Sequence, residues 1–337
     1  MKSKTRRICL VNSVYTLFLY YLICGFDEKD IFIFSNGIPE SIRNNINHIY
    51  FPPMRYTPIN KANIKNRNID FNRIYQILKL RTILFFKTAT YNTEVYGHAH
   101  LGFSFPFYEY ENSYIIEDGL GNYFNLKKPH YDNSFKKKVL YFLGNIHVGL
   151  YESFGTHENI KKVYLTKNEV PEIIKDKVVV IDREELWKMK SDEEKNKILE
   201  IFNIFDVIAN LDDDPILLLT QCFSEDRFLP IDEEIKIYEG LIENQKNKNI
   251  IIKPHPRENK DYHEIFPELK IINKEFPIEI LKCLDIPIRK IITVTSTAAL
   301  NFVDECEIEL YAGKTSSSLI NSSMDAFKKQ IEIEKNK

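Results

Sequence analysis

Ile250-Ile-Ile-Lys-Pro-His-Pro-Arg257 is the stretch that decides the fold of this chain. Its three isoleucines predict a buried strand of a parallel sheet, because such strands are covered on both faces and are rich in β-branched residues. Two prolines end the strand, since proline is excluded from helix interiors and from central strands. Lys253, His255 and Arg257 therefore reach the strand end together, at the edge where open α/β sheets bind ligands.

A second apolar strand, Ile291 to Val294, runs into Thr295-Ser-Thr-Ala-Ala-Leu300. Hydroxyl side chains followed by small and apolar residues predict a capped helix start. The N-terminus of a helix that carries hydroxyl groups is a ready site for an anion. Together with the cations and the histidine of the first stretch, it predicts a site for a phosphate-bearing leaving group.

Composition limits the class of protein. A chain of 337 residues is long enough for two domains of ordinary size. Its net charge of −2 lacks the basic excess expected of a nucleic-acid binder. The five cysteines form no CxxC pair, which indicates free, buried thiols in a reducing compartment. Asp212-Asp-Asp214 stands beside a proline, and we interpret it as a linker, so no metal site is expected.

The N-terminus permits two interpretations. Basic residues up to Arg7 precede an apolar run from Ile8 to Phe26, which is the pattern of a signal anchor. Asn12 and Thr16 interrupt that run, and Ile8–Val11 by itself predicts a strand before a helix. We favour the strand and helix, and the anchor stays as the alternative.

Strands that alternate with helices predict βαβ units, and so an α/β fold of two Rossmann-like domains at residues 1–205 and 206–337. The strands expected in the first domain are Ile8–Val11, Ile31–Phe34, Thr82–Phe86, Tyr114–Ile116 and Lys177–Ile181. Those expected in the second are Ile216–Thr220, Ile250–Lys253, Ile291–Thr295 and Ile308–Tyr311. The expected helices are Ser191–Phe205, Asp232–Lys246, Glu279–Cys283, Ala298–Val303 and a charged tail from Asp325. An asparagine-rich loop is expected from Asn60 to Asn72.

Two acidic motifs are candidates for proton transfer. Glu117-Asp-Gly119 follows an apolar strand, and the glycine lets the chain turn so that both acids are exposed. Such acids can take a proton from a hydroxyl group, although the motif alone is more often a structural turn. Asp232 stands at a predicted helix start, where a carboxylate is either an N-cap or a catalytic base.

These motifs, in this order, resemble those of bacterial sialyltransferases and most closely those of glycosyltransferase family 52, the lipooligosaccharide sialyltransferases. Glu117-Asp-Gly-Leu-Gly-Asn122 is similar to the acidic-glycine motif of the family. Pro254-His-Pro-Arg257 is similar to its His-Pro motif, and Ser296-Thr-Ala-Ala-Leu300 to its serine motif. The resemblance extends from the first strand to Tyr311.

The resemblance implies a GT-B fold, in which two Rossmann-like domains flank a cleft and the C-terminal one binds the donor nucleotide without a metal or cofactor. It implies inverting transfer of sialic acid from CMP-sialic acid to a terminal galactose of a surface glycan, lipooligosaccharide or capsule. Asp232 then takes the place of the general base, His255 of the general acid and Ser296 of the phosphate-binding serine. Related sialyltransferase families use the acid of the turn, here Asp118, as the base, and the loop before Asp232 is longer here than in the family.

The resemblance also sets the remaining expectations. The donor side comprises Lys253, Pro254, Arg257, Glu279, Thr295, Ser296 and Thr297, and the acceptor side Glu117, Asp118 and Gly119. The expected partners are the nucleotide-sugar donor, a galactose-terminated glycan and a second copy of the chain in a homodimer. A cytoplasmic location is expected, with peripheral association at the inner face of the bacterial inner membrane left open. Two alternatives remain: a GT-B enzyme with another donor, such as a glucosyl nucleotide, and a non-catalytic glycan-binding protein of the same fold.

Overall fold

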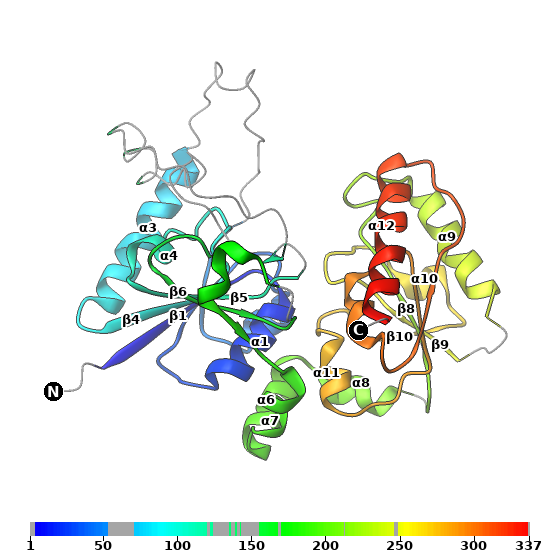
Figure 1. Ribbon diagram of the computed structural model, residues 1–337, viewed down its shortest axis with the longest axis horizontal. Helices are drawn as coiled ribbons and strands as arrows, with labels where there is room; N and C mark the ends of the chain where they lie inside the picture. The colour runs from blue at the N-terminus through cyan, green and yellow to red at the C-terminus, as the bar shows by residue number, and fades with distance from the viewer. Residues whose placement is uncertain are drawn as a thin grey trace. The chain divides into compact units, whose positions relative to one another are not determined.

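The computed structural model describes residues 4–52, 71–119, 122–123, 135, 139, 142, 155–167, 170–211, 213–245 and 249–335. The chain forms two compact units, residues 1–194 and 195–337. Each unit is built on a parallel sheet with helices around it (Figure 1). The units divide after Glu194, inside helix α7 (Asp192–Ile201), whereas the sequence led us to expect the division after Phe205.

The first unit contains a seven-stranded sheet in the order β3-β2-β1-β4-β5-β6-β7, and all its described pairs are parallel. The strands are β1 (Thr5–Val11), β2 (Ile31–Phe34), β3 (His48–Tyr50), β4 (Asn92–Gly97), β5 (Asn112–Ile116), β6 (Ile160–Leu165) and β7 (Val178–Val180). The helices are α1 (Val14–Cys24), α2 (Glu40–Asn44), α3 (Phe71–Thr88), α4 (Pro106–Glu109), the 3-10 helix η2 (Glu172–Lys177), α6 (Arg183–Lys188) and α7.

Helix α3 corrects one prediction. The run Thr82–Phe86, expected as a strand, lies inside this helix. Ile77, Leu80 and Leu84 are buried in the core of the first unit, and their spacing is that of one helix face. Phe85 and Phe86, which made the run look like a strand, are exposed instead.

The N-terminal strand and helix agree with the favoured interpretation of the sequence. Residues Ile8–Val11 form the buried end of β1, and α1 follows after the N-cap Ser13, whose side chain accepts the Thr16 N–H. Helix α1 ends at Gly25, which has a positive φ of 67°. In the described part of the chain, no helix has both the length and the apolar character needed to cross a membrane.

The second unit contains a five-stranded sheet in the order β10-β9-β8-β11-β12, again with parallel pairs. The strands are β8 (Ile216–Leu219), β9 (Ile250–Lys253), β10 (Lys270–Ile271), β11 (Lys290–Thr293) and β12 (Glu307–Leu310). The helices are α8 (Ile204–Asn210), α9 (Ile231–Glu243), α10 (Tyr262–Ile265), α11 (Glu279–Cys283), the 3-10 helix η3 (Thr297–Phe302) and α12 (Ser318–Lys335). Strand β8 comes first in the chain and lies in the middle, as in the doubly wound folds of nucleotide-binding proteins.

Two helices of the second half differ from expectation in form. The helix expected after β11 is the short 3-10 helix η3, so a helix dipole adds little at this position. The helix expected at Ser191–Phe205 is divided at Asn203, whose φ of 52° interrupts helical geometry between α7 and α8. The strands expected in this half are present as β8, β9, β11 and β12. The loop Asn60–Asn72 falls outside the described residues except for its last two, which begin α3.

Candidate functional site

Most of the residues predicted to bind the donor lie at the carboxyl ends of two strands of the second sheet, β9 and β11. Strand β8 lies between β9 and β11, so the connections leave it in opposite directions, and ligands bind at such switch points. Strand β9 delivers His255, and β11 delivers Ser296. Thr293 ties the edge together, since its hydroxyl donates to the Leu219 carbonyl at 2.8 Å.

His255 is held by its backbone and by one side of its ring. Its N–H donates to Glu258 Oε2 at 2.6 Å and to Thr220 Oγ1 at 3.2 Å. Ring atom Nδ1 accepts the Arg257 N–H at 3.2 Å and lies 3.0 Å from Cys222 Sγ. Burial, then the positive charge of Arg257, lowers the pKa of His255 to about 4, so the ring is neutral at pH 7.

A cluster of ion pairs around Lys260 supports the turn that contains His255. Lys260 Nζ lies 2.8 Å from Glu225, 3.0 Å from Glu258 and 3.1 Å from Glu234. Glu258 also accepts the Tyr262 hydroxyl at 2.6 Å and a short hydrogen bond from Thr220. The carboxylate that positions the His255 backbone is therefore itself fixed.

Lys253 is turned into the protein. Its ammonium donates to the carbonyls of Lys274 at 3.0 Å and Pro254 at 3.3 Å, and it lies 4.7 Å from the Phe276 ring centroid. Burial lowers the pKa of Lys253 to about 8, against the negative charge of Glu279. Glu279 is also buried. These contacts assign Lys253 a role in supporting the turn, whereas Glu279 accepts a hydrogen bond from Asn301 Nδ2 at 2.8 Å.

Arg257 is the donor-side cation that reaches the surface. Its guanidinium makes two hydrogen bonds of 3.0 Å to the two oxygens of Asp226, and this pairing raises the pKa of Arg257. About half of the Arg257 side chain is exposed, so the paired guanidinium is accessible at the surface. It can exchange part of this pairing for a phosphate.

Ser296 combines burial with an uncommitted hydroxyl. Its backbone N–H donates to Thr293 Oγ1 at 3.3 Å, and it caps η3 without a side-chain hydrogen bond. Within the described residues the Ser296 hydroxyl has no hydrogen-bond partner in the protein. Thr295 is half-buried and Thr297 is exposed beside it.

Asp232 occupies a different position from the one expected. Helix α9 starts at Ile231 with Pro230 as its N-cap, so the expectation that Asp232 is the N-cap is wrong. Its side chain is exposed, and in the part of the chain that the structure describes no hydrogen bond holds its carboxylate. No recorded contact among those residues joins Asp232 to His255.

The acidic turn of the first unit, in contrast, holds a carboxylate in place. Asp118 follows β5, and Ser13 from the end of β1 donates to its Oδ1 at 2.8 Å. His98 Nε2 lies 3.3 Å from Oδ1 and His100 Nε2 lies 3.5 Å from Oδ2, both after β4. Burial raises the pKa of Asp118, while His100 and the hydroxyl donors counter this in part. About a quarter of the side chain is exposed.

The two neighbours of Asp118 have structural roles. Glu117 is buried and accepts hydrogen bonds at 2.6 Å from the Tyr123 hydroxyl and the Thr166 N–H, which ties β5 to β6. Gly119 adopts a φ of 92°, which L side chains rarely reach, and its missing side chain leaves the turn open. Of the acceptor-side set, Asp118 is therefore the side chain that can meet a substrate.

Two clusters of described residues bring three metal-binding side chains within 4.8 Å: His98, His100 and Asp118, and Glu225, Glu234 and Glu258. The second already holds the Lys260 ammonium. In the first, His98 Nδ1 accepts the Asn12 N–H at 3.4 Å, so its proton is on Nε2, 2.7 Å from Thr16 Oγ1. Both ring nitrogens of His98 are therefore hydrogen-bonded within the protein.

Sequence reasoning missed several residues of these two edges. Thr220, Cys222 and Glu258 surround His255, and their roles depend on strand order rather than on any motif. His98 and His100 were missed because β4 was not recognised as a strand. The residues of high β propensity in Thr93-Glu-Val-Tyr-Gly97, followed by His-Ala-His, were the signal available.

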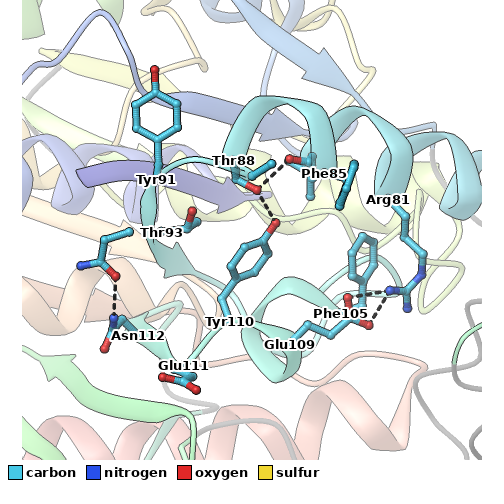
Figure 2. Close-up of a pocket in the computed structure, with 13 residues that line it drawn as sticks. Arg81, Phe85, Thr88, Tyr91, Thr93, Phe105, Glu109, Tyr110, Glu111 and Asn112 are labelled. Carbon is cyan, nitrogen blue, oxygen red and sulfur yellow. Dashed lines mark hydrogen bonds and ion pairs between the residues drawn. The ribbon is translucent and has the colours of Figure 1, made fainter. Parts of the chain in front are cut away.

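A further cavity of about 520 Å³ lies at the opposite, amino-terminal edge of the first sheet (Figure 2). Asn92 and Asn112, which begin β4 and β5, line it together with the end of α3. Its polar groups mostly bond to one another, such as the Thr88 and Tyr110 hydroxyls at 2.9 Å. It contains none of the predicted site residues.

Comparisons of the sequence with known proteins found a matching family and a relative. The sequence profile of glycosyltransferase family 52 matches residues 43–317. A protein of Haemophilus influenzae strain KW20 Rd, itself described as uncharacterized, is 33% identical over 302 residues, which cover 87% of this chain and 94% of that protein.

Solved structures share the fold at low sequence identity. The 2,6-sialyltransferase of Photobacterium sp. JT-ISH-224, solved with CMP and lactose, has a TM-score of 0.59 and 12% identity, and the match covers 98% of this chain and 76% of that one. The α-2,3-sialyltransferase of Photobacterium phosphoreum has a TM-score of 0.56 and 12% identity over 99% of this chain and 96% of that one. The GT-B domain of a Photobacterium damselae sialyltransferase has a TM-score of 0.53 and 14% identity, with 98% of both chains covered. The expected α/β fold of the GT-B type is confirmed.

Proposed function

Since the chain belongs to glycosyltransferase family 52, we propose that it is an inverting sialyltransferase. The proposed reaction moves sialic acid from CMP-sialic acid to a terminal galactose of a surface glycan. The observation that carries the proposal is the carboxyl edge of the second sheet, where β9 and β11 flank β8 and present the His255 imidazole and the Ser296 hydroxyl. A fold neighbour solved with CMP and lactose supports the same class of donor and acceptor.

The donor-side residues suit a single phosphate. In this proposal Ser296 donates its hydroxyl to a phosphate oxygen, and His255 hydrogen-bonds another through Nε2. Arg257, half-exposed and already aligned by Asp226, adds positive charge. CMP leaves readily once its phosphate charge is stabilised, so the proposed reaction uses side chains and no metal.

The acceptor hydroxyl needs a carboxylate to take its proton, and two carboxylates are candidates. The contacts favour Asp118 over Asp232, because Asp118 is oriented by Ser13 and flanked by histidines. Its raised pKa makes it a stronger base than an exposed aspartate. Asp232 lacks comparable support in the described structure.

The experiment is direct. The protein is incubated with CMP-sialic acid and lactose, and sialylated product and free CMP are measured. Calorimetry should show that CMP binds more tightly than UDP, since the site offers groups for one phosphate. Tighter binding of UDP, or glycan binding without turnover of any nucleotide sugar, would rule out the proposed reaction.

His255→Ala should lower turnover roughly 100-fold, a scale typical for a lost acid–base or hydrogen-bonding group at the reacting centre. CMP binding should weaken less. Near-normal turnover would reduce His255 to a turn residue.

A further inference from the structure

The geometry points to Cys222 as a positioning residue for His255, a role that makes His255 a neutral hydrogen-bond donor to the leaving phosphate instead of a proton donor. This inference rests on the proposed function and concerns how the same site works. It departs from the expectation that His255 acts as a general acid.

The evidence begins with the ring atom Nδ1. It accepts the Arg257 backbone N–H at 3.2 Å, and a backbone N–H can only donate. Cys222 Sγ lies 3.0 Å from the same atom, on the loop that follows β8. Burial raises the pKa of Cys222 to about 12, so the thiol keeps its proton and is a second donor. Two donors on Nδ1 leave the single ring proton on Nε2.

Burial is the largest cause that keeps the His255 ring neutral, and the surrounding charges act in the same direction. Arg257 and Lys253 oppose protonation, and they outweigh Asp226 and Glu225, which favour it. Together, burial and these charges lower the pKa of His255 to about 4. A bound phosphodiester would have to raise it by about three units to make the imidazolium at pH 7. One opposite charge typically shifts a pKa by about 1–3 units, which at most equals the shift required, and the tests below decide between the neutral and the protonated ring.

The reaction balances without a proton on the phosphate. The bond between the anomeric carbon and the phosphate oxygen breaks, and its electron pair goes to that oxygen. The acceptor oxygen bonds to the anomeric carbon, and its proton goes to the base carboxylate. CMP leaves as a dianion, which is its stable form above a second phosphate pKa of about 6. His255 Nε2–H and Ser296 stabilise the growing charge as fixed dipoles.

The first test is the pH dependence of turnover at saturating CMP-sialic acid and lactose. The rate should rise as the base carboxylate ionises and then stay level from pH 7 to 9. His255→Gln, whose amide N–H replaces Nε2–H, should retain about tenfold more turnover than His255→Ala. His263→Gln is the matched control, because His263 is an exposed histidine on α10 outside the site, and it should match the wild type.

The second test observes the ring itself and needs no activity. In ¹⁵N-histidine-labelled protein with CMP bound, His255 should show a protonated Nε2 and an unprotonated Nδ1 at pH 7. The resonance is assigned by its loss in His255→Gln. Cys222→Val, which keeps the volume but removes the thiol donor, leaves the Arg257 N–H as the remaining described donor to Nδ1. The tautomer with the proton on Nδ1 should then gain population, and turnover should fall a few-fold. Cys222→Ser, which keeps a donor, should restore both.

The outcomes separate the two claims. An alkaline loss of about tenfold per pH unit that disappears in His255→Gln would overturn the inference, as would a doubly protonated ring with CMP bound. A Cys222→Val enzyme with wild-type tautomer and turnover would remove the role of Cys222. Failure of the wild type to transfer sialic acid would instead refute the proposed function, and the ring measurement would still decide the tautomer.

Discussion

Replacing Lys260 by methionine removes the positive charge that holds together two buried carboxylates, Glu234 and Glu258, and the partly buried Glu225. The Lys260 side chain is 3% exposed, and those of Glu234 and Glu258 are fully buried. Burial opposes the charge of Lys260, but its hydrogen bond to Glu225 and the nearby carboxylates raise its pKa overall. Removing one partner of a buried ion pair costs about 3–5 kcal/mol, because the remaining charges stay buried without compensation. We expect a loss of that size from a unit whose total stability is on the order of 5–15 kcal/mol.

The loss should depend on pH in a defined direction. Without the ammonium, burial raises the pKa of Glu258 further above its value in the unfolded chain. The folded variant then binds more protons than the unfolded one, so its stability increases as pH falls towards 5. Lys260→Met, Glu234→Gln should recover part of the loss at pH 7.5, since one buried negative charge is removed.

The assay is urea unfolding followed by circular dichroism at pH 7.5 and pH 5.5. Lys290→Met is the matched control in the same unit, because Lys290 pairs with Glu307 and Glu309 near the surface. Such pairs contribute about 0–1 kcal/mol. A Lys260→Met variant that loses no more than this control, or whose loss is the same at both pH values, would refute the reasoning.

Three further predictions concern the two edges. Asp118→Asn should nearly abolish sialic acid transfer while CMP binding is kept, and Asp232→Asn should retain activity; the reverse result in the transfer assay would move the base to Asp232. Ser296→Ala removes a hydrogen bond to a charged group, worth about 1.5–3 kcal/mol, and calorimetry should show weaker CMP binding, whereas unchanged affinity would leave Ser296 a simple cap. Gly97→Ala forces a φ of 118° on alanine and places its Cβ 2.0 Å from the Leu10 carbonyl oxygen. The variant should lose at least roughly 1–3 kcal/mol of stability, measured as a lower melting temperature. A wild-type melting temperature would contradict the tight approach of β4 to β1.

Strands β8 and β9 were predictable from the sequence because their apolar composition and the residues that end them both indicate buried strands. The isoleucine run of β9 and the apolar run of β8 are buried throughout, and prolines or polar loops mark their ends. The strand predicted at Thr82–Phe86 was wrong for the opposite reason, since the apolar residues of this run suit either a strand or a helix. Its true form depends on burial of Ile77 and Leu84 against the sheet, which no local pattern contains.

The sequence by itself determined the parallel α/β class, the β9 strand with its proline stop, and the types of side chain that the proposed function assigns to phosphate binding. These follow from period, β-branching and the geometry of proline, which act over a few neighbouring residues. Only the tertiary structure decided which of those side chains can reach a ligand. Lys253 is buried and donates to backbone carbonyls, and Glu117 accepts hydrogen bonds from the residue after β6. Asp118 is oriented by residues that follow β1 and β4. The physical reason is that strand order brings together residues far apart in the chain, and burial and hydrogen bonding among them then set charge and reactivity.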